Sequence, residues 1–206
     1  MRLIRAILLT GITLSAAAYE AAQEPAPPKQ DAANVTDAVY ANECLALTYR
    51  LPDGWKFQKI AEPPPGQSRQ QMILFKAKPA SADTSNERLE IRLLQTPLKH
   101  PVLVRFNTLM ELTLVQGDPE YTKVTRAAYP VTIAGRDFAR SDFATRHGAL
   151  ALFSTWYRGY VLTAWDSADS QQNLEDVAKA LNTLSFGEDK RTAECFDSPN
   201  QASSVR

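Results

Sequence analysis

The chain has few of the residues that most often carry catalysis or bind metal. It contains two cysteines and two histidines in 206 residues. Cys44 and Cys195 are far apart in the sequence, and so are His100 and His147, so the close spacing of zinc ligands is absent. The Gly-x-Ser-x-Gly motif of a nucleophile elbow is also missing. So are the glycine motifs that cradle phosphate. We therefore expect a non-enzymatic protein with no catalytic residues, no metal site and no cofactor.

The chain also lacks an excess of either charge and an apolar run of membrane-spanning length. Lys and Arg together number 23, and so do Asp and Glu. A nucleic-acid partner requires a basic face, so the composition argues against one. The apolar run at residues 6–18 has about 13 residues, whereas a spanning helix needs about 20. We expect no stable membrane anchor once this segment is removed.

What the N-terminus does contain is the pattern of a signal peptide. Arg2 and Arg5 precede the apolar run, and three alanines end it at Ala18. Charge, apolar run and small residues in this order predict a secretory signal at residues 1–18, and hence a secreted or periplasmic protein. A short anchor that stays attached is the alternative.

The two cysteines flank the predicted domain. In an oxidising compartment an isolated pair favours one disulfide, Cys44–Cys195, and two free thiols are the alternative. We divide the rest of the chain into a proline-rich linker at 19–36, a domain at 37–187 and a tail at 188–206 tethered by Cys195.

Apolar periodicity within the domain predicts strands joined by short turns, with two helices. Alternation predicts strands near 43–52, 72–78, 89–95, 128–133, 136–145, 149–157 and 160–166. A helix is predicted over 101–115, with Val102, Phe106 and Leu109 as its apolar stripe. The second helix is predicted over 170–184, where the apolar positions are Leu174, Val177, Leu181 and Leu184. Strands joined by tight turns are antiparallel, so the fold class is α+β, with one mostly antiparallel sheet and flanking helices.

Several segments resemble a known family. Val39-Tyr40-Ala41-Asn42 followed by Leu47-Thr48-Tyr49-Arg50-Leu51-Pro52-Asp53-Gly54-Trp55 is similar to the opening of PsbP-like or Mog1-like domains. Ile133-Ala134-Gly135-Arg136-Asp137-Phe138, the Arg158-Gly159-Tyr160 turn and the closing Leu184-Ser185-Phe186 extend the resemblance over residues 38–187. It implies an α/β/α sandwich and a non-catalytic role in binding or assembly. Neither the photosystem role nor the nuclear-transport role of other members is carried over.

The residues themselves offer only weak candidates for a binding surface. Arg136, Arg140, Arg158 and Trp165 are candidates, and Arg136 and Arg140 share a strand face because their spacing is even. Ordinary solvation of that face is the alternative. Trp55 is predicted to be a core residue that follows a turn, with a groove-lining role as the alternative.

An acidic edge is also predicted at the last hairpin and helix. It comprises Asp166, Asp169, Glu175 and Asp176. Either it binds a cation or partner, or it places favourable charge at a helix N-terminus.

The function that we expect is binding of a protein or an envelope component. A module for a small ligand or the cell wall is the alternative, and a hydrolase built from scattered residues is a third.

Overall fold

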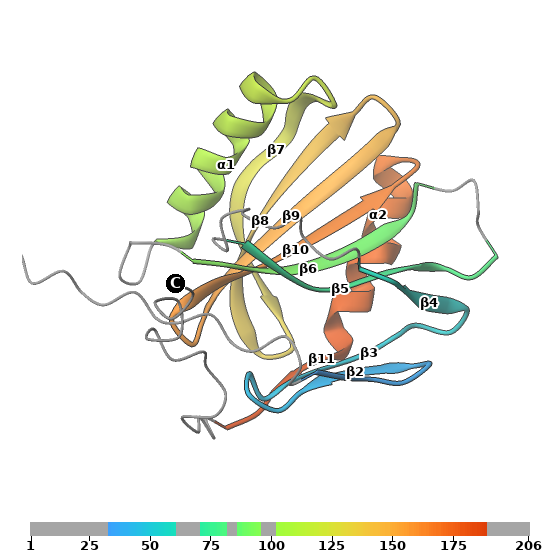
Figure 1. Cartoon of the computed structure of the whole chain (residues 1–206). Coiled ribbons are helices and arrows are strands. Elements are labelled where there is room, and N and C mark those ends of the chain that lie inside the picture. The colour runs from blue at the N-terminus through green and yellow to red at the C-terminus, as the bar shows by residue number, and fades with distance from the viewer. Residues whose placement is uncertain (1–32, 61–70, 82–85, 96–101, 189–206) are drawn as a thin grey trace, which may run out of the picture.

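The computed structural model describes residues 33–60, 71–81, 86–95 and 102–188, and it contains two antiparallel sheets and two α-helices (Figure 1). The large sheet has the strand order β4-β5-β6-β10-β9-β8-β7, and the small sheet has the order β1-β2-β3-β11. The elements in chain order are β1 (Ala33–Val35), β2 (Val39–Asn42), β3 (Leu47–Arg50), β4 (Trp55–Gln58), β5 (Gln71–Pro79), β6 (Arg88–Leu94), α1 (Leu103–Gly117), β7 (Tyr121–Ile133), β8 (Arg136–Thr145), β9 (Gly148–Tyr157), β10 (Tyr160–Ala168), α2 (Gln171–Lys179), the 3-10 helix η2 (Ala180–Thr183) and β11 (Leu184–Phe186). The predicted α+β class is confirmed.

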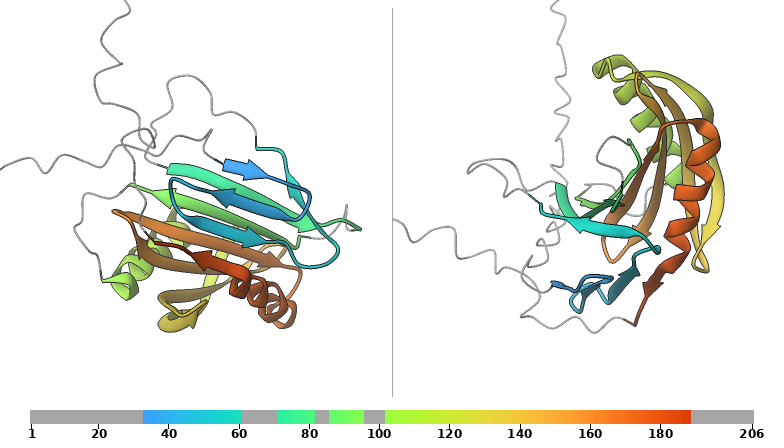
Figure 2. Two further views of the ribbon diagram at one scale, coloured as in Figure 1. Left: turned by 90° about the horizontal axis from the view of Figure 1, so that it is seen from below. Right: turned by 90° about the vertical axis from the view of Figure 1, so that its right-hand side faces the viewer.

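The two helices cover opposite faces of the large sheet. Asn107 of α1 donates to Ser141 Oγ of β8, whereas Glu175 of α2 accepts from the neighbouring Arg140 of the same strand. Adjacent residues of a strand point to opposite faces, so α1 and α2 lie on different sides. The small sheet shares the α2 side of the large sheet (Figure 2). On this side Tyr49 of β3 stacks on Phe75 of β5.

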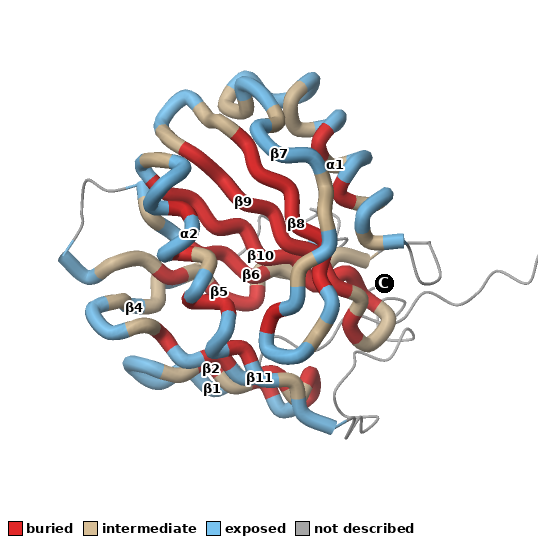
Figure 3. Tube along the Cα trace, turned by 180° about the vertical axis from the view of Figure 1, so that it is seen from behind, coloured by how far each residue is buried: buried red, intermediate tan, exposed pale blue. Residues whose placement is uncertain are grey.

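The core follows from this layering. The central strands β8, β9 and β10 are buried along most of their length, whereas β7 and the outer helix faces are exposed (Figure 3). The larger apolar cluster fills the space between the large sheet, α2 and the small sheet. The smaller one lies under α1 and contains Phe143, Leu150, Leu152 and Trp165. No helix in the described part of the chain is long and apolar enough to cross a membrane.

The prediction of one sheet is wrong, because the chain builds a second one. Its strand β3 is shorter than predicted: residues 43–46 form a turn, in which Ala46 N–H donates to Glu43 O and Ala46 takes a φ of 45°. Strand β1, which lies in the segment predicted as a linker, pairs with β2 of the predicted domain.

The apolar stripe predicted for the first helix, Val102, Phe106 and Leu109 with Leu103 and Met110 beside them, is wrong in part. Met110 packs against the smaller apolar cluster. Leu109 is 58% exposed and Val102 is 61% exposed, whereas Asn107 and Glu111 are the buried residues of α1. Both polar side chains hydrogen-bond to the sheet beneath them, which is why they can occupy the buried side.

The apolar positions predicted for the second helix are confirmed, but the α-helix ends at Lys179, the 3-10 helix η2 follows it, and Leu184 begins β11. Leu174, Val177, Leu181 and Leu184 are all buried. Ser170 is the N-cap, and its side chain accepts a hydrogen bond from Asn173 N–H.

Candidate functional site

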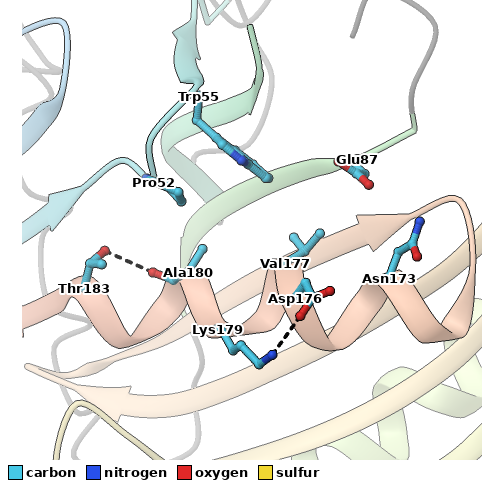
Figure 4. Close-up of a pocket in the computed structure, with 9 residues that line it drawn as sticks. All are labelled: Pro52, Trp55, Glu87, Asn173, Asp176, Val177, Lys179, Ala180 and Thr183. Atoms are coloured by element: carbon cyan, nitrogen blue, oxygen red, sulfur yellow. Dashed lines mark hydrogen bonds and ion pairs between the residues drawn. The ribbon is translucent and has the colours of Figure 1, made fainter. Parts of the chain in front are cut away.

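A groove of about 380 Å³ separates α2 from the edge of the large sheet (Figure 4). Nine residues line it: Pro52, Trp55, Glu87, Asn173, Asp176, Val177, Lys179, Ala180 and Thr183. They come from the turn after β3, the start of β4, the segment before β6, and the helical stretch α2–η2. The groove therefore lies where four segments that are distant in the sequence meet.

A tight turn places the indole of Trp55 over this groove. Trp55 N–H donates to Pro52 O at 3.1 Å, and Gly54 between them has a φ of 78°, which glycine adopts without strain. Trp55 then pairs with Pro79 as the first residue of β4. The side chain is half-buried, packs against the edge of the core and points toward Val177 (Figure 4). Trp55 thus packs against the core and also lines the groove.

The helical wall combines an apolar floor with a polar rim. Val177 and Ala180 are buried and face the groove one turn apart. Asp176 at the rim forms an ion pair with Lys179, with 2.7 Å between carboxylate oxygen and ammonium nitrogen. Thr183 Oγ1 lies 2.6 Å from Arg50 O and 3.0 Å from Ala180 O. Its single hydrogen is directed to these carbonyls, so this hydroxyl is left to act as an acceptor.

Ion pairs of the buried Arg140 connect the same helix to the sheet. Arg140 is 6% exposed; its guanidinium donates to both carboxylate oxygens of Glu175, and its Nε donates to Asp142 Oδ1 at 2.7 Å. The hydrogen bonds from Arg140 hold the pKa of Glu175 below its ordinary value. This bidentate geometry fixes the orientation of α2 beside the groove.

The four residues predicted as a binding surface do not form one. Arg140 lies buried on the α2 side and Trp165 lies buried on the α1 side, where Arg92 stacks on its ring at 4.5 Å. Arg136 is half-buried, donates to Trp156 O and lies over the Tyr157 ring. The even spacing of Arg136 and Arg140 places them on one face of the strand, but it does not indicate whether solvent or α2 covers that face.

Arg158 connects the two ends of the domain. Its guanidinium donates to Cys44 O at 3.3 Å and to Glu188 O at 2.7 Å. The residue itself forms the β9–β10 turn with a φ of 54°.

The predicted acidic edge is also not a single surface. Asp166 lies fully buried in β10, Glu175 is engaged by Arg140, and Asp176 pairs with Lys179. Asp169 Oδ1 accepts from Asn86 N–H at 2.9 Å. Helix α2 begins at Gln171 and has no acidic residue in its first turn.

One of the two histidines, His147, lies within the described residues. His147 is an exposed turn residue whose Nε2 is 3.9 Å from a carboxylate oxygen of Glu120. Ser154 is buried in β9. His100 and Cys195 lie outside the described residues, so the predicted Cys44–Cys195 pairing stays a prediction. Within the described ranges, no group of three His, Cys, Asp or Glu residues is arranged to hold a metal ion.

Comparison with solved structures identifies the architecture. The solution structure of cyanobacterial PsbP (CyanoP) from Synechocystis sp. PCC 6803 superimposes with a TM-score of 0.52, at 10% identity, over 74% of this chain and 95% of that one. The fold is PsbP-like. A crystal structure from Bacteroides thetaiotaomicron VPI-5482 matches with a TM-score of 0.44, at 12% identity, over 75% of this chain and 50% of that one. Searches against family models and curated proteins found no match.

The sequence predicts Trp55 as a core residue, with groove lining as the alternative, and it does not predict the other residues that line the groove. Trp55 was singled out because an aromatic residue follows a Pro-Asp-Gly turn. The polar residues Glu87, Asn173 and Thr183 carry no motif. The periodicity of the second helix could have indicated them. When Leu174 and Leu181 face the core, the helical repeat places positions 173, 176, 177 and 180 together on one side.

Proposed function

We propose that this chain is an exported, non-enzymatic binding domain whose groove between Trp55 and α2 receives part of a protein partner. The observation that carries the proposal is the half-buried indole of Trp55 held over an open groove. Tryptophan in such a setting offers a large apolar surface at little conformational cost and is enriched among the residues that dominate binding energy.

The surroundings of Trp55 support this role. The ion pairs of Arg140 fix α2, and the hydrogen bonds of the β4 turn fix Trp55. A site between two anchored elements is formed before its partner arrives, which lowers the ordering cost of binding.

A second candidate is a module for a small ligand or a cell-wall fragment. The volume of the groove favours it, because about 380 Å³ falls within the range of about 300–1,000 Å³ for small-molecule pockets. In that case a saccharide would bind to the purified chain without any protein partner.

Site-specific crosslinking tests the proposed partner. A photo-crosslinking residue at position 173 faces the groove, whereas one at Gln171, which contacts Thr125, lies elsewhere on the same helix. We expect a crosslinked protein from position 173 and none from position 171. That protein, once purified, should bind the full chain in calorimetry.

Two groove variants complete the test. Asn173→Trp fills the groove from an exposed position, and Trp55→Ala removes the indole. Each should weaken binding of the purified partner at least about tenfold, as for a dominant interface residue. Unchanged binding in the folded Asn173→Trp protein would refute the proposal.

Export is tested separately. Protein recovered outside the cytoplasm should begin near residue 19, because residues 1–18 have the pattern of a cleaved signal. N-terminal sequencing measures this. An intact Met1 on exported material would contradict it.

A further inference from the structure

We infer that the groove binds a basic side chain, an arginine or a lysine, of its protein partner. This inference rests on the proposed function and specifies the chemistry of the segment that enters. It follows from the balance of charges around the groove, from the aromatic ring at its edge and from the cation that the chain itself already places there.

In the described lining of the groove, carboxylates outnumber cations. Glu87 and Asp176 contribute carboxylates, whereas Lys179 contributes one ammonium group. Thr183 adds a hydroxyl whose hydrogen is already directed to Arg50 O and Ala180 O. The Asn173 amide and the Trp55 indole N–H are the neutral donors of the lining. A positively charged group complements this excess of carboxylates, and guanidinium and ammonium groups bring donors without acceptors.

The aromatic ring favours a cation over other donors. Trp55 is the aromatic residue of the lining, and tryptophan is the strongest partner for a cation stacked on its face. The indole of Trp55 and the carboxylate of Asp176 lie on opposite walls of the groove, so a basic side chain finds an aromatic surface for its stem and a charge for its head. An anionic ligand would instead meet two carboxylates, with Lys179 as the one cation among the described residues of the lining.

Lys179 shows that an ammonium group fits at the rim. Its Nζ lies 2.7 Å from Asp176 Oδ1. The side chains are 72% and 77% exposed, and such surface pairs contribute little to stability. A basic side chain of the partner can therefore displace Lys179 from Asp176. Lys179 thus competes with the basic side chain of the partner for the carboxylate of Asp176.

Nuclear magnetic resonance of the full chain tests the inference with three probes. The first is the blocked tripeptide acetyl-Gly-Arg-Gly-amide, the second has citrulline in place of arginine, and the third is N-acetylglucosamine. Citrulline keeps the shape of arginine and removes its charge. We expect a saturable shift of the Trp55 indole N–H signal with the arginine peptide, and binding at least about threefold weaker with citrulline, as for loss of an exposed cation–π contact.

Charge variants give the sharper result. Lys179→Ala should tighten binding of the arginine peptide about twofold or more, because it removes the competitor, and Asp176→Asn should weaken it by a similar factor. Lys123→Ala, which removes the same charge from an exposed position on β7, is the matched control and should change nothing.

The outcomes separate this inference from the proposed function. Four results would refute the inference that a basic side chain binds. They are equal binding of the arginine and citrulline peptides, a preference for the sugar, no binding of any probe, and weaker binding of the arginine peptide by Lys179→Ala. If Asn173→Trp still abolishes binding of the crosslinked partner, the groove remains the partner site and only its chemistry was misassigned. If that variant leaves partner binding intact, the proposed function itself fails.

Discussion

Asp166 is a carboxyl group in the middle of the larger core. It is 0% exposed, and among the described residues neither of its oxygens has a hydrogen-bond partner. Burial raises its pKa well above the ordinary value, and the charge of Arg140 offsets this only in part. The hydroxyl of Tyr49 is likewise buried, and burial is the main cause that raises its pKa. Burial therefore favours the neutral form of both groups.

Asp166 should make the domain lose stability as pH rises. A raised pKa in the folded state means that unfolding releases a proton once pH exceeds the unfolded value of about 3.9. The contribution of Asp166 is thus fully present below that pH and is lost as pH rises toward its folded pKa. We expect the free energy of unfolding of Asp166→Asn, relative to that of the natural chain, to increase between pH 4.5 and pH 7.5.

Urea unfolding at three pH values measures this difference. The charged groups around Asp166 include Arg140, Asp142 and Glu175, whose ion pairs are unchanged by the substitution. Asp176→Asn, on the surface, is the control and should show no such trend. A pH-independent difference between Asp166→Asn and the natural chain would show that Asp166 is ionised in the folded state.

Arg140 is predicted to be far more important for folding than Glu175, although the two are partners. Removing the guanidinium in Arg140→Ala leaves Asp142 buried without its cation, which costs about 3–5 kcal/mol. Glu175→Ala removes a side chain that is largely exposed, and the expected loss is about 1 kcal/mol or less. Chemical denaturation of the two variants compares them, and equal losses would contradict this assignment.

At the scale of the element, α1 depends on polar contacts where its sequence predicted apolar ones. Asn107 Nδ2 lies 3.3 Å from Ala139 O and 3.2 Å from Leu152 O, and Glu111 Oε1 accepts from Ala128 N–H at 2.7 Å. Ser141 Oγ donates to the same carboxylate oxygen at 2.6 Å. These bonds attach the helix to strands β7, β8 and β9, whose backbone groups they satisfy.

Asn107→Ala should therefore destabilise the domain by about 1–3 kcal/mol, the cost of leaving buried polar groups unsatisfied. Leu109→Ala, on the exposed side of the same helix, should change stability by less than about 0.5 kcal/mol. Urea denaturation ranks the two. The reverse order would show that α1 packs through its apolar side, as its sequence suggested.

The contrast between the two helices shows what sequence periodicity can predict. Leu174, Val177 and Leu181 identified the buried side of α2, because only apolar contacts were needed there. On α1 the choice between Asn107 and Leu109 depends on carbonyl groups of Ala139 and Leu152, which lie far away in the sequence. The spacing of apolar residues along a helix does not indicate which distant backbone groups its polar residues will contact.

At the scale of the whole molecule, local turns could be predicted and distant pairings could not. The meander from β8 to β10 was predicted from its turns, because tight turns force antiparallel neighbours. The small sheet pairs Leu47 with Phe186 and Tyr49 with Leu184, residues from opposite ends of the domain. The groove was missed for the same reason, since it joins the turn after β3 to α2.

This meeting of the two ends supports the predicted disulfide. Gly187 N–H donates to Ala46 O at 2.7 Å, and Arg158 bridges Cys44 O and Glu188 O. Cys195 follows Glu188 by seven residues in the sequence, and an extended chain spans up to about 3.3–3.6 Å per residue. The chain can therefore return from Glu188 to Cys44 without moving the domain.

We expect exported protein to contain one Cys44–Cys195 bridge. It would close a loop of about 150 residues, for which chain-entropy models give about 5 kcal/mol of stabilisation. Non-reducing peptide mapping should recover the two cysteine peptides linked, and reduction should lower the free energy of unfolding to that of the Cys44→Ser/Cys195→Ser double variant. Alkylation of both thiols without prior reduction would contradict the bridge. Because Arg158 holds residues 44 and 188 together independently of any disulfide, the reduced protein should keep the PsbP-like fold and lose only part of its stability.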